Sequence, residues 1–205
     1  MPGLSSRLCD LQWGRVACVL VLLGACLAPV DRASAFGFED LVSRAQDLAG
    51  QAYVAPKPVP RFLREIDYDA YQGIRFDEAK SLWRESGSRF QVMLFPPGLF
   101  YTHPVDIHVI DAEGVHRLPY DKGFFEFADP ELERRVPADL GYAGLKLTYP
   151  LAGGSEQNQF LVFAGASYFR AVGRDNAWGL SGRGIAVNTG LPSGEEFPSF
   201  TSFWL

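Results

Sequence analysis

The residues best suited to ligand chemistry gather in residues 160–200, where aromatic, basic, acidic and glycine residues follow an apolar run. Aromatic rings can pack against the C–H faces of a sugar ring, while charged and amide groups bind its hydroxyls. The candidate binding residues that supply this chemistry are Tyr168, Arg170, Arg174, Asn176, Trp178 and Arg183. Each has a structural alternative, because the rings could belong to a core and the arginines could form ion pairs.

Carboxylates are plentiful, but their positions identify no acid–base pair. Inverting hydrolysis of a glycosidic bond needs two carboxyl groups separated by roughly 6.5–9.5 Å. The candidates considered are Asp106, Asp121, Asp175, Glu195 and Glu196. Glu195 and Glu196 lie in a Gly/Pro-rich loop that is typical of a solvent-facing turn, and Asp175 could shape a turn or pair with an arginine. We therefore assign no catalytic residue.

Metal and cofactor signatures are weak. His103, His108 and His116 are too scattered in the sequence to predict a metal site. Residues 179–184 are glycine-rich but lack the strand–GxGxxG–helix context of a dinucleotide site. Ser167 and Ser181 do not lie in a GxSxG elbow. We expect neither a metal nor a cofactor.

The first 35 residues have the pattern of a cleavable signal peptide. Arg7 and Arg15 provide a positive region, residues 16–28 are apolar but short for a membrane span, and Ala33-Ser34-Ala35 is a small-x-small cleavage site. The mature chain is then expected to begin at Phe36, with no transmembrane segment after it. The alternative is lipidation at Cys26, because residues 23–26 resemble a lipobox.

Charge and cysteine content limit the function further. The chain has a formal net charge of −5, and removal of residues 1–35 leaves it acidic. Nucleic-acid binding needs clustered positive charge, so we expect no nucleic-acid partner. All the cysteines, Cys9, Cys18 and Cys26, lie in the expected signal peptide, so the exported chain could form no disulfide.

Residues 36–60 predict a helix and a strap that precede the main domain. Apolar residues recur at helical spacing over residues 38–49, Glu39 and Asp40 favour the first turn, and Gly50 is a plausible stop. Residues 55–60 read APKPVP, which is typical of an extended polyproline-like segment.

From residue 61 the pattern predicts short strands joined by turns. Strands are expected over residues 71–76, 89–95, 105–109 and 145–149, with a helical turn or two over residues 77–86 and a hairpin turn at residues 111–114. Residues 160–165 form an apolar run typical of a strand, and residues 167–172 alternate. The near absence of a strand–helix–strand rhythm favours a mainly β fold, an antiparallel β-sandwich with a short N-terminal helix.

Several blocks of the sequence, in the same order, resemble one protein family. They read IDYDAYQGIRF at residues 66–76, LW at 82–83, FQV at 90–92, FPPG at 95–98, FLVFAGASYFR at 160–170 and GLPSGEEFP at 190–198. These blocks identify the chain as similar to the periplasmic glucans biosynthesis proteins, types G and D. The sequence has no twin-arginine pair before the apolar region, which slightly favours type G but does not distinguish the two types.

The resemblance implies a galactose-mutarotase-like β-sandwich followed by an immunoglobulin-like domain. It also implies action in the bacterial periplasm on osmoregulated glucans with a β-1,2-linked backbone, and some members are inverting endo-β-1,2-glucanases. Their catalytic carboxylates are expected downstream of the position of Leu205. Residues 61–205 would then be the first part of an incomplete sandwich, inactive and prone to aggregation by itself.

Two functions remain open for the full-length protein. It could bind and process the β-1,2-glucan backbone, with the residues in 160–200 lining part of the cleft. Alternatively, it could be a non-catalytic glucan-binding or assembly factor that acts with the membrane glucan synthase.

Overall fold

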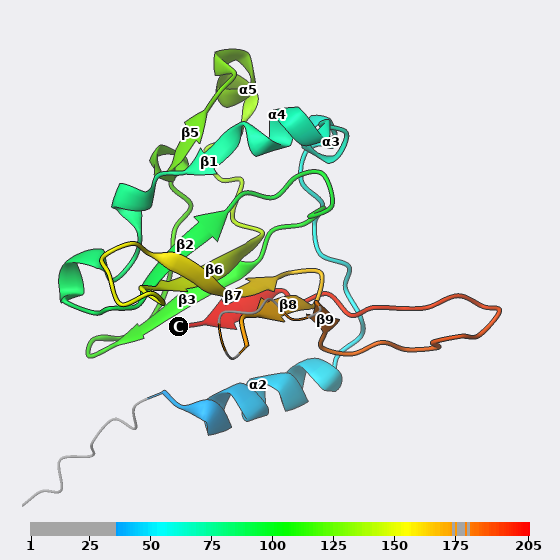
Figure 1. The fold of residues 1–205 in the computed structure, drawn as a ribbon. Coiled ribbons are helices and arrows are strands. Elements are labelled where there is room, and N and C mark those ends of the chain that lie inside the picture. The colour runs from blue at the N-terminus through cyan, green and yellow to red at the C-terminus, as the bar shows by residue number, and fades with distance from the viewer. Residues whose placement is uncertain (1–35, 174, 176–178, 180) are drawn as a thin grey trace, which may run out of the picture. The chain divides into compact units, whose positions relative to one another are not determined.

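The computed structural model describes residues 36–205 apart from 174, 176–178 and 180 (Figure 1). Strands in three sheets dominate this part of the chain, and its helices are short. The expected mainly β class is therefore confirmed. Within the described residues, no helix has the length and apolar content needed to cross a bilayer.

The helix expected near residue 38 is confirmed as α2 (Phe38–Ala49). Asp40 helps to cap the amino terminus of α2, because its carboxylate accepts a hydrogen bond from the Gly37 N–H at 2.7 Å. Beyond the helix, residues 51–60 have no regular secondary structure. The Val59 N–H donates to the Thr102 carbonyl at 2.9 Å, which ties the proline-rich strap to the body.

The largest sheet is antiparallel and has the order β2-β6-β7-β8-β9. Its strands are β2 (Gln91–Phe95), β6 (Gly144–Tyr149), β7 (Asn158–Ala164), β8 (Tyr168–Ala171) and β9 (Gly182–Arg183). Apolar and polar residues alternate along β6, so one face of the sheet is apolar and the other carries polar side chains.

A second sheet has the order β10-β3-β4, built from β10 (Ser202–Trp204), β3 (Asp106–Asp111) and β4 (Gly114–Arg117). The predicted hairpin turn is confirmed, because Asp111 pairs with Gly114. β10 pairs with β3 in parallel, although the pattern predicted antiparallel pairing. The long intervening chain permits this arrangement, since parallel neighbours need a crossover rather than a tight turn.

These two sheets share a core, as in a β-sandwich. The ring of Phe163 on β7 lies 6.1 Å from that of Phe203 on β10. Leu145 on β6 and Ile107 on β3 are each 1% exposed and belong to the same apolar cluster. The apolar face of the larger sheet is therefore buried, and its polar face points the other way.

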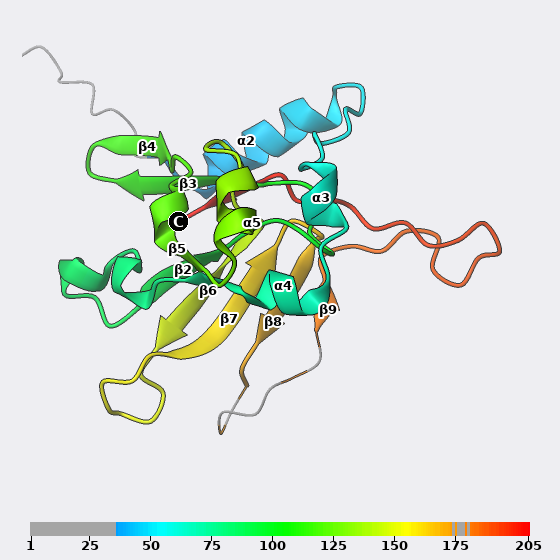
Figure 2. The ribbon, with the colours of Figure 1, turned by 90° about the horizontal axis from the view of Figure 1, so that it is seen from above.

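A third group of elements lies above the larger sheet in the view of Figure 1, and its buried residues belong to the same apolar cluster as Leu145 and Ile107 (Figures 1 and 2). It contains α3 (Arg61–Arg64), α4 (Tyr68–Gln72), α5 (Pro130–Arg135) and the two-stranded sheet of β1 (Ile74–Phe76) and β5 (Phe125–Phe127). Short 3-10 helices, η1 (Glu78–Lys80), η2 (Arg84–Ser86) and η3 (Lys122–Phe124), connect the strands. The helical turns predicted for residues 77–86 are confirmed.

The strand predicted over residues 71–76 is wrong in its first half. The chain forms α4 up to Gln72 and becomes a strand only at Ile74. The Asp67 carboxylate accepts a hydrogen bond from the Ala70 N–H at 2.8 Å and so caps α4 at its start. This helix presents Tyr71 toward the polar side of the large sheet, where it contributes to the site described next.

Candidate functional site

Strand register places two cations on the polar face of the large sheet. Lys146 on β6 and Arg170 on β8 are both paired with Val162 on the strand between them. Side chains directly opposite one another in a sheet point to the same face. Met93 on β2 continues this row on the other side of Lys146.

The adjoining row places Tyr168 on the same face. Tyr168 pairs with Ala164 and with Arg183, and Ala164 pairs with Gly144. Gly144 is required here, because a Cβ would lie 2.6 Å from the ring of Phe95 and would also collide with the Phe163 carbonyl oxygen. Gly144 and Ala164 are both buried at this point of the sheet, between Phe95 and Tyr168 in the strand register.

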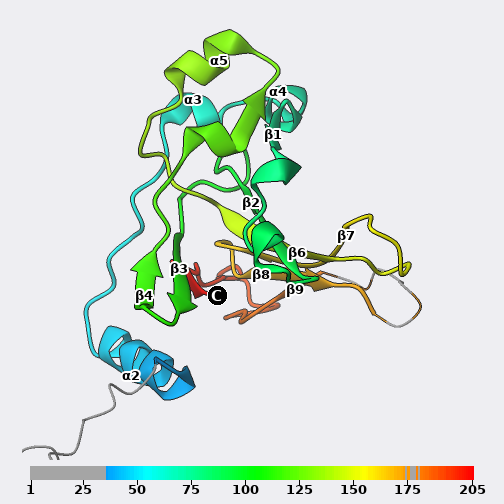
Figure 3. The ribbon, with the colours of Figure 1, turned by 90° about the vertical axis from the view of Figure 1, so that its left-hand side faces the viewer.

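A groove of about 470 Å³ runs between this face and the α4–β1–η1 segment. Figure 3 shows the same arrangement from the side, with α4 and β1 above the strands. The polar and aromatic residues that line the groove are Tyr71, Gln72, Arg75, Phe76, Glu78, Phe95, Tyr101, Lys146, Gln159, Tyr168 and Arg170. The groove therefore combines ring faces, hydrogen-bonding groups and charges, the combination expected of a site for a polyhydroxylated ligand.

Lys146 is half-buried in this groove. Burial lowers the pKa of its ammonium, and Glu78 acts in the opposite direction. Among the described residues, Lys146 makes no direct hydrogen bond or ion pair. The ammonium is therefore a donor with unused capacity inside the groove.

Two tyrosines from outside the sheet complete the aromatic lining. The Tyr71 hydroxyl donates to the Pro96 carbonyl at 2.8 Å, which fixes the ring's position. Tyr101 lies 5.2 Å from the Phe95 ring and 6.5 Å from the Tyr71 ring, measured between centroids. Burial raises the pKa of both phenols, so each stays neutral at physiological pH.

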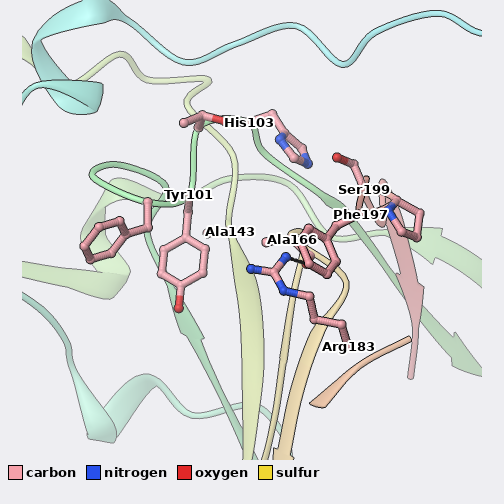
Figure 4. Close-up of a pocket in the computed structure, with 11 residues that line it drawn as sticks. Tyr101, His103, Ala143, Ala166, Arg183, Phe197 and Ser199 are labelled. Atoms are coloured by element: carbon pink, nitrogen blue, oxygen red, sulfur yellow. Dashed lines mark hydrogen bonds between the residues drawn. The ribbon is translucent and has the colours of Figure 1, made fainter. Parts of the chain in front are cut away.

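A smaller pocket of about 170 Å³ adjoins the groove, and Tyr101 lines both (Figure 4). Arg183 enters this pocket with its guanidinium 4.2 Å from the centroid of the Phe197 ring. The same guanidinium donates to the Ala166 carbonyl at 2.8 Å. His103 and Ser199 also line the pocket, so it too offers an aromatic ring beside polar groups.

The structure therefore divides the predicted binding residues. Tyr168 and Arg170 line the groove, whereas Arg183 lines the smaller pocket. Arg174, Asn176 and Trp178 lie outside the described residues. Sequence reasoning missed Lys146, Tyr71, Tyr101 and Glu78, which are far from residues 160–200 in the chain. The one available signal was the placement of Lys146 on the polar face of a predicted strand.

None of the carboxylates considered as catalytic candidates lines the groove, and hydrogen bonds elsewhere account for three of them. Asp106 accepts hydrogen bonds from Arg117, with the shorter contact at 2.6 Å. Asp121 caps η3, and Glu196 accepts from the Asn188 amide at 2.8 Å. Among the described groove residues, Glu78 is the one carboxylate. The described residues of the groove therefore bring together no pair of carboxyl groups.

The histidines serve different local roles. His103 lines the small pocket, and His108 stacks on Trp204 with ring centroids 4.9 Å apart. His116 lies with Asp111 and Glu113 at the exposed β3–β4 turn. Asp111 already accepts hydrogen bonds from the N–H groups of Glu113 and Gly114, so the turn itself explains this cluster.

Comparison with known proteins places the chain in a family. The model of the family described as periplasmic glucan biosynthesis protein, MdoG, matches residues 36–205. Glucans biosynthesis protein G of Pseudomonas putida (strain W619) is 41% identical over 172 residues, which are 83% of this chain and 30% of that protein. The protein of the same name from Ralstonia nicotianae is 39% identical over 180 residues, 87% of this chain and 36% of its own length.

The chain thus spans about a third of the length of the curated relatives it matches. The family match covers every residue that lines the groove and the small pocket. The chain belongs to the MdoG family of periplasmic glucan biosynthesis proteins.

Proposed function

We propose that this protein acts in periplasmic glucan biosynthesis by binding a β-1,2-linked glucan along the groove and the adjoining small pocket. The observation that carries the proposal is the groove itself. It sets Tyr168, Arg170 and Lys146 on one open sheet face beneath the rings contributed by α4 and by Tyr101. The family to which the chain belongs supplies the class of ligand.

The dimensions and lining suit a sugar chain. A volume of about 470 Å³ lies within the range of small-molecule binding clefts. Tyr101 lines both cavities and so makes them neighbours, and we propose that a long ligand continues from the groove into the pocket that holds Arg183. Neighbouring sugar units would then meet separate sets of rings and donors, as an extended polymer requires.

The proposal includes processing of the glucan by the full-length protein. Inverting cleavage needs an acid and a base carboxyl, and the described groove residues offer Glu78 alone. We therefore propose that the acid–base pair comes from the part of the longer relatives that this chain does not span. The groove would contribute binding energy that positions the polymer for cleavage.

The same observation favours a second candidate function. A groove rich in binding groups and poor in carboxylates also suits a non-catalytic factor that holds the nascent glucan for the membrane glucan synthase. In that case the protein would bind glucan without changing its chain length.

One experiment separates these functions. The full-length protein is titrated with linear β-1,2-glucan by calorimetry, and the same mixture is then followed by chromatography for shorter products. Binding with shortened chains supports processing, and binding with unchanged chains supports the assembly role. Neither binding nor products at high protein concentration would contradict both functions.

We also propose export to the periplasm by a signal peptide cleaved after Ala35. Supporting this are the charged and apolar segments of the leader and the start of the family match at residue 36. Mass spectrometry of the exported protein should find Phe36 at the amino terminus. A diacylated Cys26 would show that the lipoprotein alternative is correct.

A further inference from the structure

Phe100 is an exposed residue at the small pocket. It is 77% exposed, and it lines the pocket beside its neighbour Tyr101. Single exposed apolar side chains are common on protein surfaces and need no explanation by themselves. Phe100 calls for one because it borders a cavity and because the loop that carries it is bonded to its surroundings at several points.

Backbone hydrogen bonds close this loop on both sides of the ring. The Gly98 N–H donates to the Tyr101 carbonyl at 2.9 Å, and the Tyr101 N–H donates to the Gly98 carbonyl at 2.8 Å. Between them, the Leu99 N–H donates to the Leu63 carbonyl of α3 at 2.7 Å. The backbone that carries Phe100 is therefore fixed from both of its neighbours, although the side chain itself has little cover.

The same loop contains unfavourable backbone conformations. Leu99 has a φ of 51°, in the left-handed region that leucine rarely adopts, and Gly98 has a φ of 146°. A Cβ at Gly98 would lie 3.1 Å from the Leu63 carbonyl oxygen and 3.3 Å from the Tyr71 ring, so the loop is closely packed against α3 and α4. Strain of this kind is concentrated at ligand-binding and catalytic sites, where surrounding contacts impose it.

We propose that Phe100 is the stacking residue for one sugar unit of the glucan at the small pocket. This inference rests on the proposed glucan-binding function and assigns that unit its aromatic contact. The C–H face of a sugar ring packs against an aromatic face, and a residue whose backbone is already fixed loses little freedom when the ligand binds. Arg183 and Ser199 line the same pocket and offer hydrogen-bonding groups for the hydroxyls of that unit.

Two substitutions in the full-length protein separate stacking from mere exposure. Phe100→Ala removes the ring, and Phe100→Tyr restores an aromatic face. Calorimetric titration with long linear β-1,2-glucan should show affinity reduced about tenfold by Phe100→Ala and close to wild type in Phe100→Tyr. Phe38→Ala removes a ring that is 74% exposed on α2 and lines neither cavity, so this matched control should bind as wild type does.

A spectroscopic readout reports the contact itself. In Phe100→Trp the added indole should fluoresce as a solvent-exposed group without ligand. Glucan should shift its emission to shorter wavelength and protect it from acrylamide quenching, beyond any change in wild type, because a stacked sugar displaces water from the ring. Inorganic phosphate and free glucose at the same concentration should leave the emission unchanged, since neither supplies a polymer held by the groove.

The contrary outcomes are distinguishable. Wild-type affinity in Phe100→Ala, or an equal loss in Phe100→Ala and Phe100→Tyr, contradicts stacking on this ring but leaves binding in the groove intact. A lowered melting temperature of Phe100→Ala, or a buried indole in ligand-free Phe100→Trp, would show that the rest of the full-length protein covers this position. Absence of glucan binding by the wild type would contradict the proposed function itself.

Discussion

Lys146 on β6 and Arg170 on β8 flank Val162 in a single cross-strand row, so the sheet holds two cations on one face. The opposite face carries Leu145 and Phe163 into the sandwich core. One sheet thus separates the residues that stabilise the fold from those that line the groove. Substitutions on the two faces should therefore have different consequences.

Replacing Lys146 with methionine should raise stability at neutral pH. Burial lowers the pKa of the ammonium below the usual 10.5, so protonation is less favourable in the folded state than in the unfolded state. The penalty is fully present below the folded-state pKa, and it is lost as pH rises through that pKa toward 10.5. Urea denaturation should show the variant more stable at pH 7, with a smaller difference near pH 10.

The control for this prediction is Lys57→Met, at an exposed position, which should not change stability measurably. A loss of stability at pH 7 in Lys146→Met would mean that the ammonium has a stabilising partner in the folded protein. Such a result would also weaken the case for Lys146 as a ligand contact.

Gly144→Ala should be severely destabilising, by several kcal/mol. A Cβ at this position would meet the ring of Phe95 at 2.6 Å and the backbone of β7, which the sheet holds in place. Gly154→Ala is the matched control, since no atom lies within 4 Å of its added Cβ. Thermal denaturation should place Gly154→Ala close to wild type. A comparable transition for Gly144→Ala would contradict the packing described for β2, β6 and β7.

Tyr142→Phe should cost about 1–3 kcal/mol of folding free energy. The Tyr142 hydroxyl donates to the Pro119 carbonyl at 2.9 Å and accepts from the Asp121 N–H at 3.0 Å, and the residue is 1% exposed. The substitution leaves two backbone groups without this partner. Tyr53→Phe, at a residue that is 83% exposed, should have no effect in the same urea titration. Equal stability of the two variants would show that the hydroxyl network contributes little.

The sequence predicted the elements whose pattern is local. Alternation identified β2, β3 and β6, and helical spacing identified α2, because burial of one face dictates that periodicity. A continuous apolar run identified β7. The strand predicted from Tyr71 was wrong in its first half. Tyrosine, isoleucine and phenylalanine favour strands, but the hydrogen bond to the Asp67 carboxylate caps a helix there. A single capping hydrogen bond thus changed the assignment of half a predicted strand.

The binding site was predictable only where its residues are close in sequence. Tyr168 and Arg170 stand on one strand with the spacing that puts them on the same face. Lys146 joins them through pairing with β7, and Tyr101 joins through a loop beyond β2. Neither neighbour can be found from local pattern, because register and loop path depend on the folded sandwich.

The small pocket offers an independent prediction about ligand length. Phe197→Ala removes the ring beneath the Arg183 guanidinium and opens the pocket wall, without altering the groove. Titration with glucans of increasing length should show a loss of affinity for long chains and little change for the shortest ones that bind. An equal loss at every length would contradict separate contributions from the two cavities.

The most direct measurement of the central claim is the glucan affinity of the full-length protein with Tyr168→Ala in the groove. Tyr53→Ala, which removes an exposed ring outside both cavities, is its control. Calorimetric titration with linear β-1,2-glucan should show binding weakened about tenfold or more by Tyr168→Ala and unchanged by Tyr53→Ala. Wild-type affinity in a correctly folded Tyr168→Ala variant would contradict glucan binding in the groove.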